Sequence, residues 1–251
     1  MTIDTFLYRY PPLISGILKK RYKRFLADIE LETGELITAH CANTGPMLGL
    51  CSIDSRVMVS KSDNPKRKLA YTWEMIEVGE ENPVWVGINT ALPNKIIKLA
   101  LEKQLIPELA QQYTQVKSEV KFGHDGKSRI DFVLSGGDCD IYVEVKNTTL
   151  AENGVALFPD TETTRGQKHL QELMDLPSSV KRVMLYFIAR SDCTVFEVGH
   201  KFDRTYGKLF DEAREKGVII LPCRFEITPL GVEYLGSSIL KNVFFSVVDL
   251  V

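Results

Sequence analysis

In the first third of the chain, apolar and polar positions alternate over short stretches that are separated by turn residues. This alternation predicts strands. One strand-like stretch covers residues 17–31, and a turn at 33–34 leads into a second stretch over 35–41. Five short strands in under ninety residues predict a small closed barrel such as an OB-fold, and an antiparallel sandwich edge is the alternative. The remaining strands are expected over residues 56–59, 71–78 and 84–88.

After residue 90 the pattern changes to alternating helices and strands. Apolar residues at helical spacing follow Pro93 and predict a helix over 95–105. Strand, helix and strand in alternation predict an α/β core with a mixed sheet. We therefore expect an α+β chain with an OB-fold-like domain over 1–86 and a second domain over 87–251. The later elements are expected at 118–122 (strand), 123–127 (turn), 164–176 (helix), 183–189 (strand), 201–216 (helix) and 218–222 (strand).

Composition narrows the class of protein. The 251 residues are 44% hydrophobic and 25% charged, which is typical of soluble globular proteins. The net charge of -2 means that nucleic-acid binding would need locally concentrated positive charge. Five scattered cysteines without a CxxC pair indicate reduced thiols and make a zinc site unexpected. Neither a signal peptide nor a membrane-spanning run is recognisable, so we expect a cytoplasmic protein without a membrane partner.

The stretch SRIDFVLSGGDCDIYVEVK, residues 128–146, carries the candidate chemistry. Two apolar runs flank a Ser-Gly-Gly-Asp turn, which predicts a β-hairpin. Asp131, Glu144 and Lys146 lie inside these runs. Because side chains alternate along a strand, Glu144 and Lys146 are expected on the same face.

Buried charges of this kind are costly unless they serve a metal ion or a reaction. The carboxylates of Asp131 and Glu144 suit Mg²⁺, with Mn²⁺ as a substitute, because these ions accept oxygen ligands and phosphate oxygens. Such an ion lowers the pKa of bound water, and Lys146 would orient that water or stabilise the transition state. The alternative is a surface hairpin with an incidental Glu and Lys, since the spacing alone is a weak signal.

The helix that follows begins with Arg165-Gly166-Gln167-Lys168-His169, a polar and donor-rich first turn. Helix N-termini bind anions, so Gln167 or His169 would meet a phosphate or the lysine there. The alternative is that this first turn is simply exposed to solvent and that His169 is a surface residue without a functional role.

Two basic clusters stand out on this net-acidic chain. Residues 19–25 hold five cations and two aromatic rings, a combination that nucleic-acid grooves use for phosphates and stacking. In one continuous strand, Arg21, Lys23 and Phe25 would share a face. A solvated charged face is the equally weighted alternative. The candidate nucleic-acid ligands are Arg21, Lys23, Arg24, Lys66, Arg67 and Lys68.

Several long strings occur in an order that resembles one known family, the sugar fermentation stimulation protein A (SfsA) family. They are RYKRFLADIEL, HCANTGPM, SDNPKRKLAYTWE, SEVKFG, SRIDFVL, YVEVKNTTLAE and FPDTETTRGQKHLQEL. The resemblance implies an N-terminal OB-fold and a C-terminal domain similar to PD-(D/E)xK nucleases. It also implies DNA as the partner, because the family is described as DNA-binding and as a suspected regulator of sugar metabolism.

Residue by residue, the resemblance implies that Asp131 is the motif aspartate and that Glu144 and Lys146 are the ExK pair. Gln167 corresponds to a glutamine that some relatives of this nuclease class place on the next helix. Glu119 matches an acidic position before the hairpin, where it would be a further ligand or base.

The sequence also departs from the pattern. Ile130 replaces the motif proline, and Leu99 stands where the family is expected to carry Glu, with Glu102 as a substitute. Our leading hypothesis is a DNA-binding protein with Mg²⁺-dependent phosphodiesterase activity. The alternatives are a non-enzymatic DNA-binding regulator of sugar (maltose) metabolism genes, and a phosphodiesterase acting on RNA or a small nucleotide.

Overall fold

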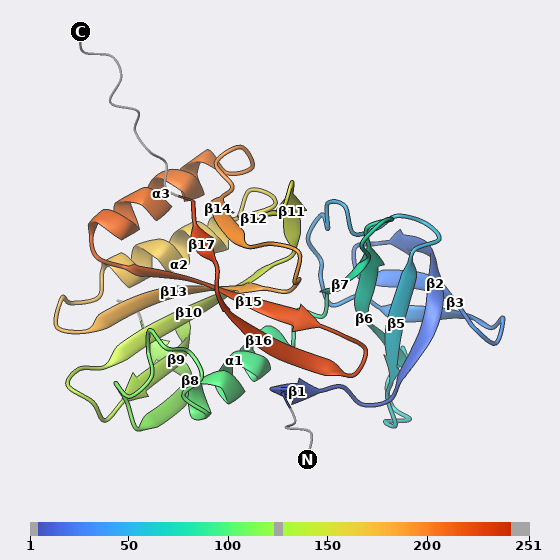
Figure 1. Ribbon diagram of the computed structural model, residues 1–251, viewed down its shortest axis with the longest axis horizontal. Helices are drawn as coiled ribbons and strands as arrows, with labels where there is room; N and C mark the ends of the chain where they lie inside the picture. The colour runs from blue at the N-terminus through green and yellow to red at the C-terminus, as the bar shows by residue number, and fades with distance from the viewer. Residues whose placement is uncertain (1–4, 123–127, 242–251) are drawn as a thin grey trace, which may run out of the picture.

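The computed structural model describes residues 5–122 and 128–241, which form two lobes joined by a continuous sheet (Figure 1). The predicted turn over 123–127 lies outside the described residues. The smaller lobe, drawn in blue to teal, is the barrel, and the larger lobe contains all three helices of the described residues.

The barrel closes through a parallel contact between its first and last edges. Its strands follow the order β4-β3-β2-β5-β6, and β4 also pairs with β6. The interior is apolar, with Leu18, Ile29, Val59 and Trp73 fully buried. The predicted OB-fold-like barrel is therefore confirmed. Its strands are β2 (Leu13–Tyr22), β3 (Leu26–Leu31), β4 (Leu36–His40), β5 (Arg56–Lys61) and β6 (Tyr71–Val78).

The single strand predicted over 17–31 is wrong. The stretch forms an antiparallel hairpin of β2 and β3, and Tyr22 pairs with Leu26 across its turn. Lys23 and Arg24 adopt positive φ angles of 49° and 65°, a conformation that glycine normally supplies in such turns. Because the turn contains no Gly, Pro or Asn, the alternation appeared continuous. The basic residues therefore lie at a hairpin end and do not share one strand face.

The second lobe contains a mixed sheet, as predicted, and helices pack on both of its faces. β10, β13 and β15 are parallel, whereas β8, β9 and β16 pair antiparallel. Residues of α1 pack on one face of the sheet, and residues of α2 and α3 pack on the other. The elements of this sheet are β8 (Gln115–Phe122), β9 (Ser128–Ser135), β10 (Ile141–Thr148), β13 (Lys181–Ile188), β15 (Ile219–Ile227) and β16 (Gly231–Ser237). The helices are α1 (Pro93–Glu102), α2 (Thr164–Met174) and α3 (Arg204–Glu215).

Four short strands form a separate small sheet in the order β11-β12-β14-β17. Their inner side chains, such as Phe196, join the core beneath α2 and α3. The sequence pattern did not predict these strands, because each is only two to four residues long. They are β11 (Leu150–Glu152), β12 (Val155–Phe158), β14 (Val195–Val198) and β17 (Ile239–Leu240).

The two lobes share backbone pairing and core. β7 (Val84–Gly87) continues the sheet from β6 to β15, and β1 (Tyr8–Arg9) pairs with β16 of the larger lobe. Met58 and Met75 of the barrel belong to the same apolar cluster as the α1 residues. Burial of this shared surface favours one fixed arrangement of barrel and sheet over a flexible pair of domains.

Candidate active site

Asp131 lies where β9 and β10 separate. The strands pair from Leu134↔Ile141 to Phe132↔Val143. Beyond this point a side chain takes the place of the backbone acceptor. The Asp131 carboxylate oxygen Oδ2 accepts a hydrogen bond from the Val145 N–H at 2.7 Å. The fold therefore fixes this half-buried carboxylate through its neighbouring strand.

The first turn of α1 provides a second contact to the same carboxylate. Asn94 Nδ2 donates to Asp131 Oδ1 at 2.6 Å. Asn94 follows Pro93, which occupies the first helical position without loss of a hydrogen bond. Helix α1 thus contributes an amide donor to the site. Glu102 is exposed and pairs with Lys98 at 3.7 Å, and Leu99 packs against the core.

Glu144 and Lys146 lie on the face of β10 that α2 covers, whereas Val143 and Val145 join the core on the opposite side. Lys146 Nζ donates to Glu144 Oε1 at 2.8 Å. The expectation that both side chains share a face is therefore confirmed. The side chain of Lys146 is only 11% exposed and that of Glu144 only 3%, so this ion pair is shielded from solvent.

His169 completes the cluster from the first half of α2. Its Nδ1 contacts Glu144 Oε1 and lies 2.9 Å from Lys146 Nζ. Arg165 Nε donates to His169 Nε2 at 3.4 Å, so a neutral ring carries its proton on Nδ1 and donates it to Glu144. Glu144 Oε1 therefore receives two donors, while Oε2 is buried and has no hydrogen-bond partner among the residues that the structure describes.

The two carboxylates differ in their electrostatics. Burial raises the pKa of Asp131 to about 6, and the nearby Glu144 charge acts in the same direction. Burial also opposes ionisation of Glu144, but the Lys146 charge and the His169 hydrogen bond together hold the pKa of Glu144 below its usual range. At neutral pH, both groups are therefore ionised next to each other.

This donor set fits one divalent cation bound between two carboxylates. Glu144 Oε2 is an orphaned buried acceptor. Burial and the Glu144 charge both raise the pKa of Asp131, and an added cation would offset the repulsion between the two carboxylates. Among the described side chains, no three from His, Cys, Asp and Glu converge as a ready-made metal cluster. Water or substrate oxygens would have to complete the coordination, as is usual for Mg²⁺.

Gln167 and Glu119 do not contact the Asp131–Glu144–Lys146 cluster within the described part of the chain. Gln167 Nε2 donates to the two carboxylate oxygens of Asp203 at 3.1 and 2.9 Å. Asp203 caps α3 by accepting from Tyr206 N–H at 2.9 Å. Glu119 is exposed on β8 at a φ of 55°. The residue of α2 that reaches Lys146 is therefore His169, which the sequence offered as an alternative to Gln167.

The basic residues of the barrel fall into two groups. Arg21 donates to the carbonyls of Asn43 and Gly45 at 3.0 and 2.8 Å, and Arg24 Nε donates to the Thr44 carbonyl at 2.7 Å. These two guanidinium groups therefore hold the turn at 43–45 in place. The other group is exposed, and of its members only Arg67 has a side-chain partner in the described structure, Thr72 Oγ1 at 2.6 Å. This group comprises Lys23, Lys66, Arg67 and Lys68.

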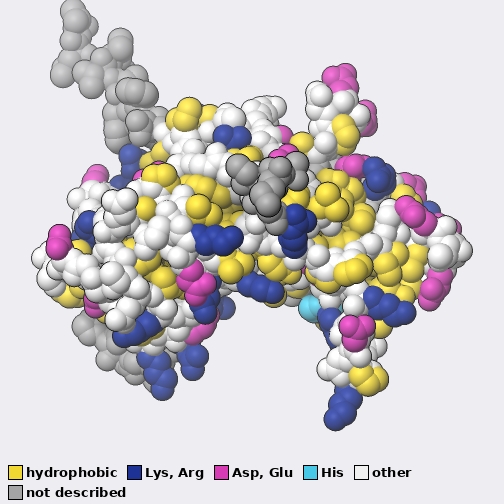
Figure 2. All heavy atoms as spheres, turned by 60° about the horizontal axis from the view of Figure 1, so that its bottom comes forward, with side chains coloured by type: hydrophobic (Ala, Val, Ile, Leu, Met, Phe, Trp, Pro, Cys, Tyr) yellow, Lys and Arg dark blue, Asp and Glu magenta, His cyan; other side chains and the backbone are white. Residues whose placement is uncertain are grey.

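Figure 2 shows the face that lies at the bottom of Figure 1. The surface is hollowed between the lower parts of the two lobes, with the barrel on the right and the larger lobe on the left. Lys and Arg side chains gather on both sides of this hollow. The shape and charge suit an extended anionic ligand more than a small neutral molecule.

Comparison with known proteins assigns the chain to a family. A model described as the SfsA N-terminal OB domain matches residues 20–88, and one described as the sugar fermentation stimulation protein RE domain matches residues 91–231. The chain belongs to the sugar fermentation stimulation protein family. A sugar fermentation stimulation protein homolog of Crocosphaera subtropica is 65% identical over 94% of this chain and 98% of its own length. A homolog from Picosynechococcus is 61% identical, covering 94% of each chain.

A solved structure of the family has the same fold. Pyrococcus furiosus SfsA in complex with Ca²⁺ matches with a TM-score of 0.84 at 25% identity, over 95% of this chain and all of that one. Within residues 5–122 and 128–241 of this SfsA family member, no helix combines the length and apolar character needed to cross a bilayer.

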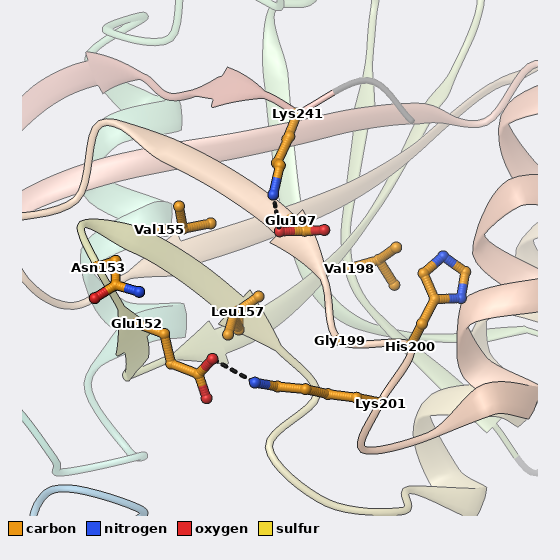
Figure 3. A pocket seen from close by; sticks show the side chains of 10 residues that line it. All are labelled: Glu152, Asn153, Val155, Leu157, Glu197, Val198, Gly199, His200, Lys201 and Lys241. Atoms are coloured by element: carbon orange, nitrogen blue, oxygen red, sulfur yellow. Dashed lines mark hydrogen bonds and ion pairs between the residues drawn. The ribbon is translucent and has the colours of Figure 1, made fainter. Parts of the chain in front are cut away.

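This SfsA family member also has a cavity of about 430 Å³ on the outer side of the small sheet (Figure 3). Lys201 pairs there with Glu152, and Lys241 pairs with Glu197 at 2.7 Å. Each cation of the cavity is thus matched by a carboxylate, and none of the lining residues belongs to the Asp131 cluster. The cavity is therefore poorly suited to bind phosphate.

Two substitutions on α2 separate the roles of Gln167 and His169. We expect Gln167→Ala to lower the free energy of unfolding by about 1 kcal/mol, because hydrogen bonds to the Asp203 carboxylate are lost. We expect His169→Ala to raise the pKa of Glu144, because a donor to Oε1 is removed. Carboxyl ¹³C NMR titration of Glu144 measures this difference. An equal shift in both variants would contradict the assignment of His169 to the site.

Proposed function

We propose that this protein binds DNA and hydrolyses phosphodiester bonds at a divalent-cation site between Asp131 and Glu144. The observation that carries the proposal is the buried, unpartnered Oε2 of Glu144 beside a carboxylate whose pKa is raised to about 6. The Ca²⁺ named in the Pyrococcus relative supports a divalent cation, and Mg²⁺ or Mn²⁺ is the proposed working ion.

Asp131 and Glu144 Oε2 would hold the cation. When bound, it supplies charge for the phosphoryl oxygens and lowers the pKa of water. The Val145 N–H and Asn94 keep Asp131 oriented. Lys146 and His169 occupy Oε1 of Glu144, which leaves Oε2 for the cation.

Lys146 has the central chemical role in this proposal. Its Nζ is held at 2.8 Å from Glu144 Oε1, and its remaining N–H groups would donate to the attacking water or to the negative charge that develops on phosphate. His169 takes the position that the family resemblance gave to Gln167. Glu119 is proposed only as a base that would need to move, since it is exposed on β8.

The barrel would bind the DNA backbone through its exposed cations. Lys23, Lys66 and Lys68 provide charge for phosphates, and Phe25, which is 45% exposed, provides a ring for stacking. Arg21 and Arg24 would act by shaping the turn beside this surface.

A second candidate is a DNA-binding regulator of sugar metabolism genes that does not cleave. The observation in its favour is that the described residues supply two carboxylates to the site and no third metal-binding side chain. In this case the cluster would be retained as part of the scaffold.

The test compares the wild type, Asp131→Ala and Asp138→Ala. Asp138 is an exposed carboxylate in the turn of the same hairpin and is the matched control. We expect Asp131→Ala to lose Mn²⁺ binding in calorimetry and roughly a hundredfold or more of cleavage activity on single- or double-stranded DNA. Asp138→Ala should match the wild type.

The two candidates predict different outcomes in this experiment. DNA binding without cleavage by the wild type would favour the regulator. Equal cleavage by the wild type and Asp131→Ala would reject the proposed site.

A further inference from the structure

The edge hairpin of the larger lobe carries an unusual pair of like charges. Lys121 on β8 lies directly opposite Arg129 on β9 in the strand register, and both side chains are exposed. Like charges in directly opposed positions destabilise a sheet. Neither side chain has an ion pair, hydrogen bond or ring contact with any residue that the structure describes. Glu119, two residues before Lys121, is exposed and pairs with neither cation.

Among the described residues, seven lysines form ion pairs with a carboxylate, and one of them is Lys146 in the candidate active site. The other six lie elsewhere, and three of them belong to helical pairs at (i, i+4) spacing. The six are Lys19, Lys98, Lys168, Lys201, Lys216 and Lys241. Lys23, Lys66 and Lys68 also lack a side-chain partner in the described structure. Lys121 and Arg129 differ from them because the strand register places two such cations directly opposite each other.

The pair lies close to the candidate active site along the strand. Arg129 precedes Asp131 by two residues on β9, which corresponds to about 7 Å along the strand. β8 and β9 belong to the larger lobe on the left of Figure 1, opposite the barrel and its exposed lysines. A backbone that crosses the hollow of Figure 2 would therefore meet cations on both lobes.

We propose that the Lys121–Arg129 pair binds the phosphate backbone of DNA beside the Asp131–Glu144 site. The larger lobe thereby holds the backbone independently of the barrel. A backbone phosphate between the two side chains, which carries one negative charge, attracts both cations and offsets their mutual repulsion. This inference rests on the proposed DNA binding and adds a second contact surface to it.

The first experiment measures DNA affinity as a function of salt. The proteins are the full-length wild type, Lys121→Gln/Arg129→Gln and the control Arg204→Gln/Lys208→Gln. The control removes two exposed cations of α3 that have no partner within residues 5–122 and 128–241, and α3 lies across the larger lobe from β8 in Figure 1. Fluorescence anisotropy with a labelled 20-base-pair duplex and with a single strand is recorded in EDTA, so that no cation chemistry contributes.

The hairpin variant is expected to reduce the slope of log K against log salt by about one to two, because each lost phosphate contact removes close to one unit. The α3 control is expected to keep the wild-type slope. An unchanged slope in the hairpin variant alongside a binding wild type would overturn this inference and leave the proposed function intact. Absence of DNA binding by the wild type would overturn both.

A second variant separates binding from folding. Lys121→Glu places opposite charges across the strands, so its thermal stability should equal or exceed that of the wild type. Its DNA affinity should nevertheless fall to about that of the double glutamine variant, because each of the two variants lowers the local charge by two units. A lower melting temperature accompanied by weak binding would identify the pair as structural and contradict the inference.

Discussion

Lys146→Met is expected to lower the free energy of unfolding by about 3–5 kcal/mol at pH 7. The substitution leaves Glu144, whose side chain is 3% exposed, without the partner that compensates its charge. Asp131 lies nearby with a second carboxylate, and this increases the cost. Urea denaturation followed by far-ultraviolet circular dichroism gives the measurement.

The pH dependence and a double variant test the cause of this loss. In the wild type the pKa of Glu144 is lowered, so its ionisation stabilises the fold above the ordinary pKa of about 4.5. This contribution disappears as the pH falls through the lowered folded-state value. In Lys146→Met, only His169 opposes the effect of burial on Glu144, so the pKa of Glu144 rises. Protonation of Glu144 near pH 4 then reduces the loss of stability relative to the wild type.

Glu144→Gln/Lys146→Met should recover most of the lost stability at pH 7, because no unpaired charge remains. If the double variant is as unstable as Lys146→Met, the loss reflects packing of the lysine stem and not charge pairing. A deficit that is independent of pH would lead to the same conclusion.

The part of the site that depends on strand periodicity could be predicted from the sequence. Strand alternation alone placed Glu144 and Lys146 on one face, and the hairpin spacing brought Asp131 to the adjacent strand. These predictions need only a period of two and a short turn. The barrel was likewise predicted from short alternating strands, even though the hairpin turn at Lys23–Arg24 was missed.

Relations between distant elements could not be predicted in this way. Asn94 reaches Asp131 from a helix 37 residues earlier, and no local pattern indicates that contact. The choice between His169 and Gln167 depends on how α2 is rotated over the sheet. Tertiary packing sets this rotation, and the capping of α3 by Asp203 provides the competing partner for Gln167.

The basic cluster illustrates the same limit. Arg21 and Arg24 belong to a sequence segment that is rich in cations, as phosphate-binding surfaces are. Their guanidinium groups, however, already donate hydrogen bonds to the backbone carbonyls of residues 43–45. The amino-acid composition gives the number of cationic side chains, but it does not show how many of their N–H groups are free to bind phosphate. The Lys121–Arg129 pair is the converse case, because two ordinary residues become notable only once the register places them opposite each other.

Asp131→Asn is expected to stabilise the metal-free protein by about 3 kcal/mol at pH 8. The pKa of Asp131 is raised from 3.8 to about 6 in the folded state. The folded protein therefore binds this proton more tightly than the unfolded chain, and stability is lost as the pH rises from about 4 to about 6. The neutral amide avoids this loss. It can still accept from Val145 N–H, and the Asn94 amide can turn to accept from it.

Denaturation curves in EDTA between pH 4 and pH 8 should show the two proteins converging at pH 4, separating between pH 4 and pH 6, and keeping a constant difference above pH 6. Saturating Ca²⁺ should then stabilise only the wild type, because binding adds RT ln(1 + [L]/Kd) to the state that holds the ion. A variant that is less stable than the wild type at every pH in EDTA would show that the Asp131 carboxylate is needed for folding. The sign of the change in stability caused by Asp131→Asn therefore distinguishes two roles of the carboxylate. A stabilised variant indicates a carboxylate that destabilises the metal-free fold and serves to bind a cation, whereas a destabilised variant indicates a carboxylate that stabilises the fold through its hydrogen bonds.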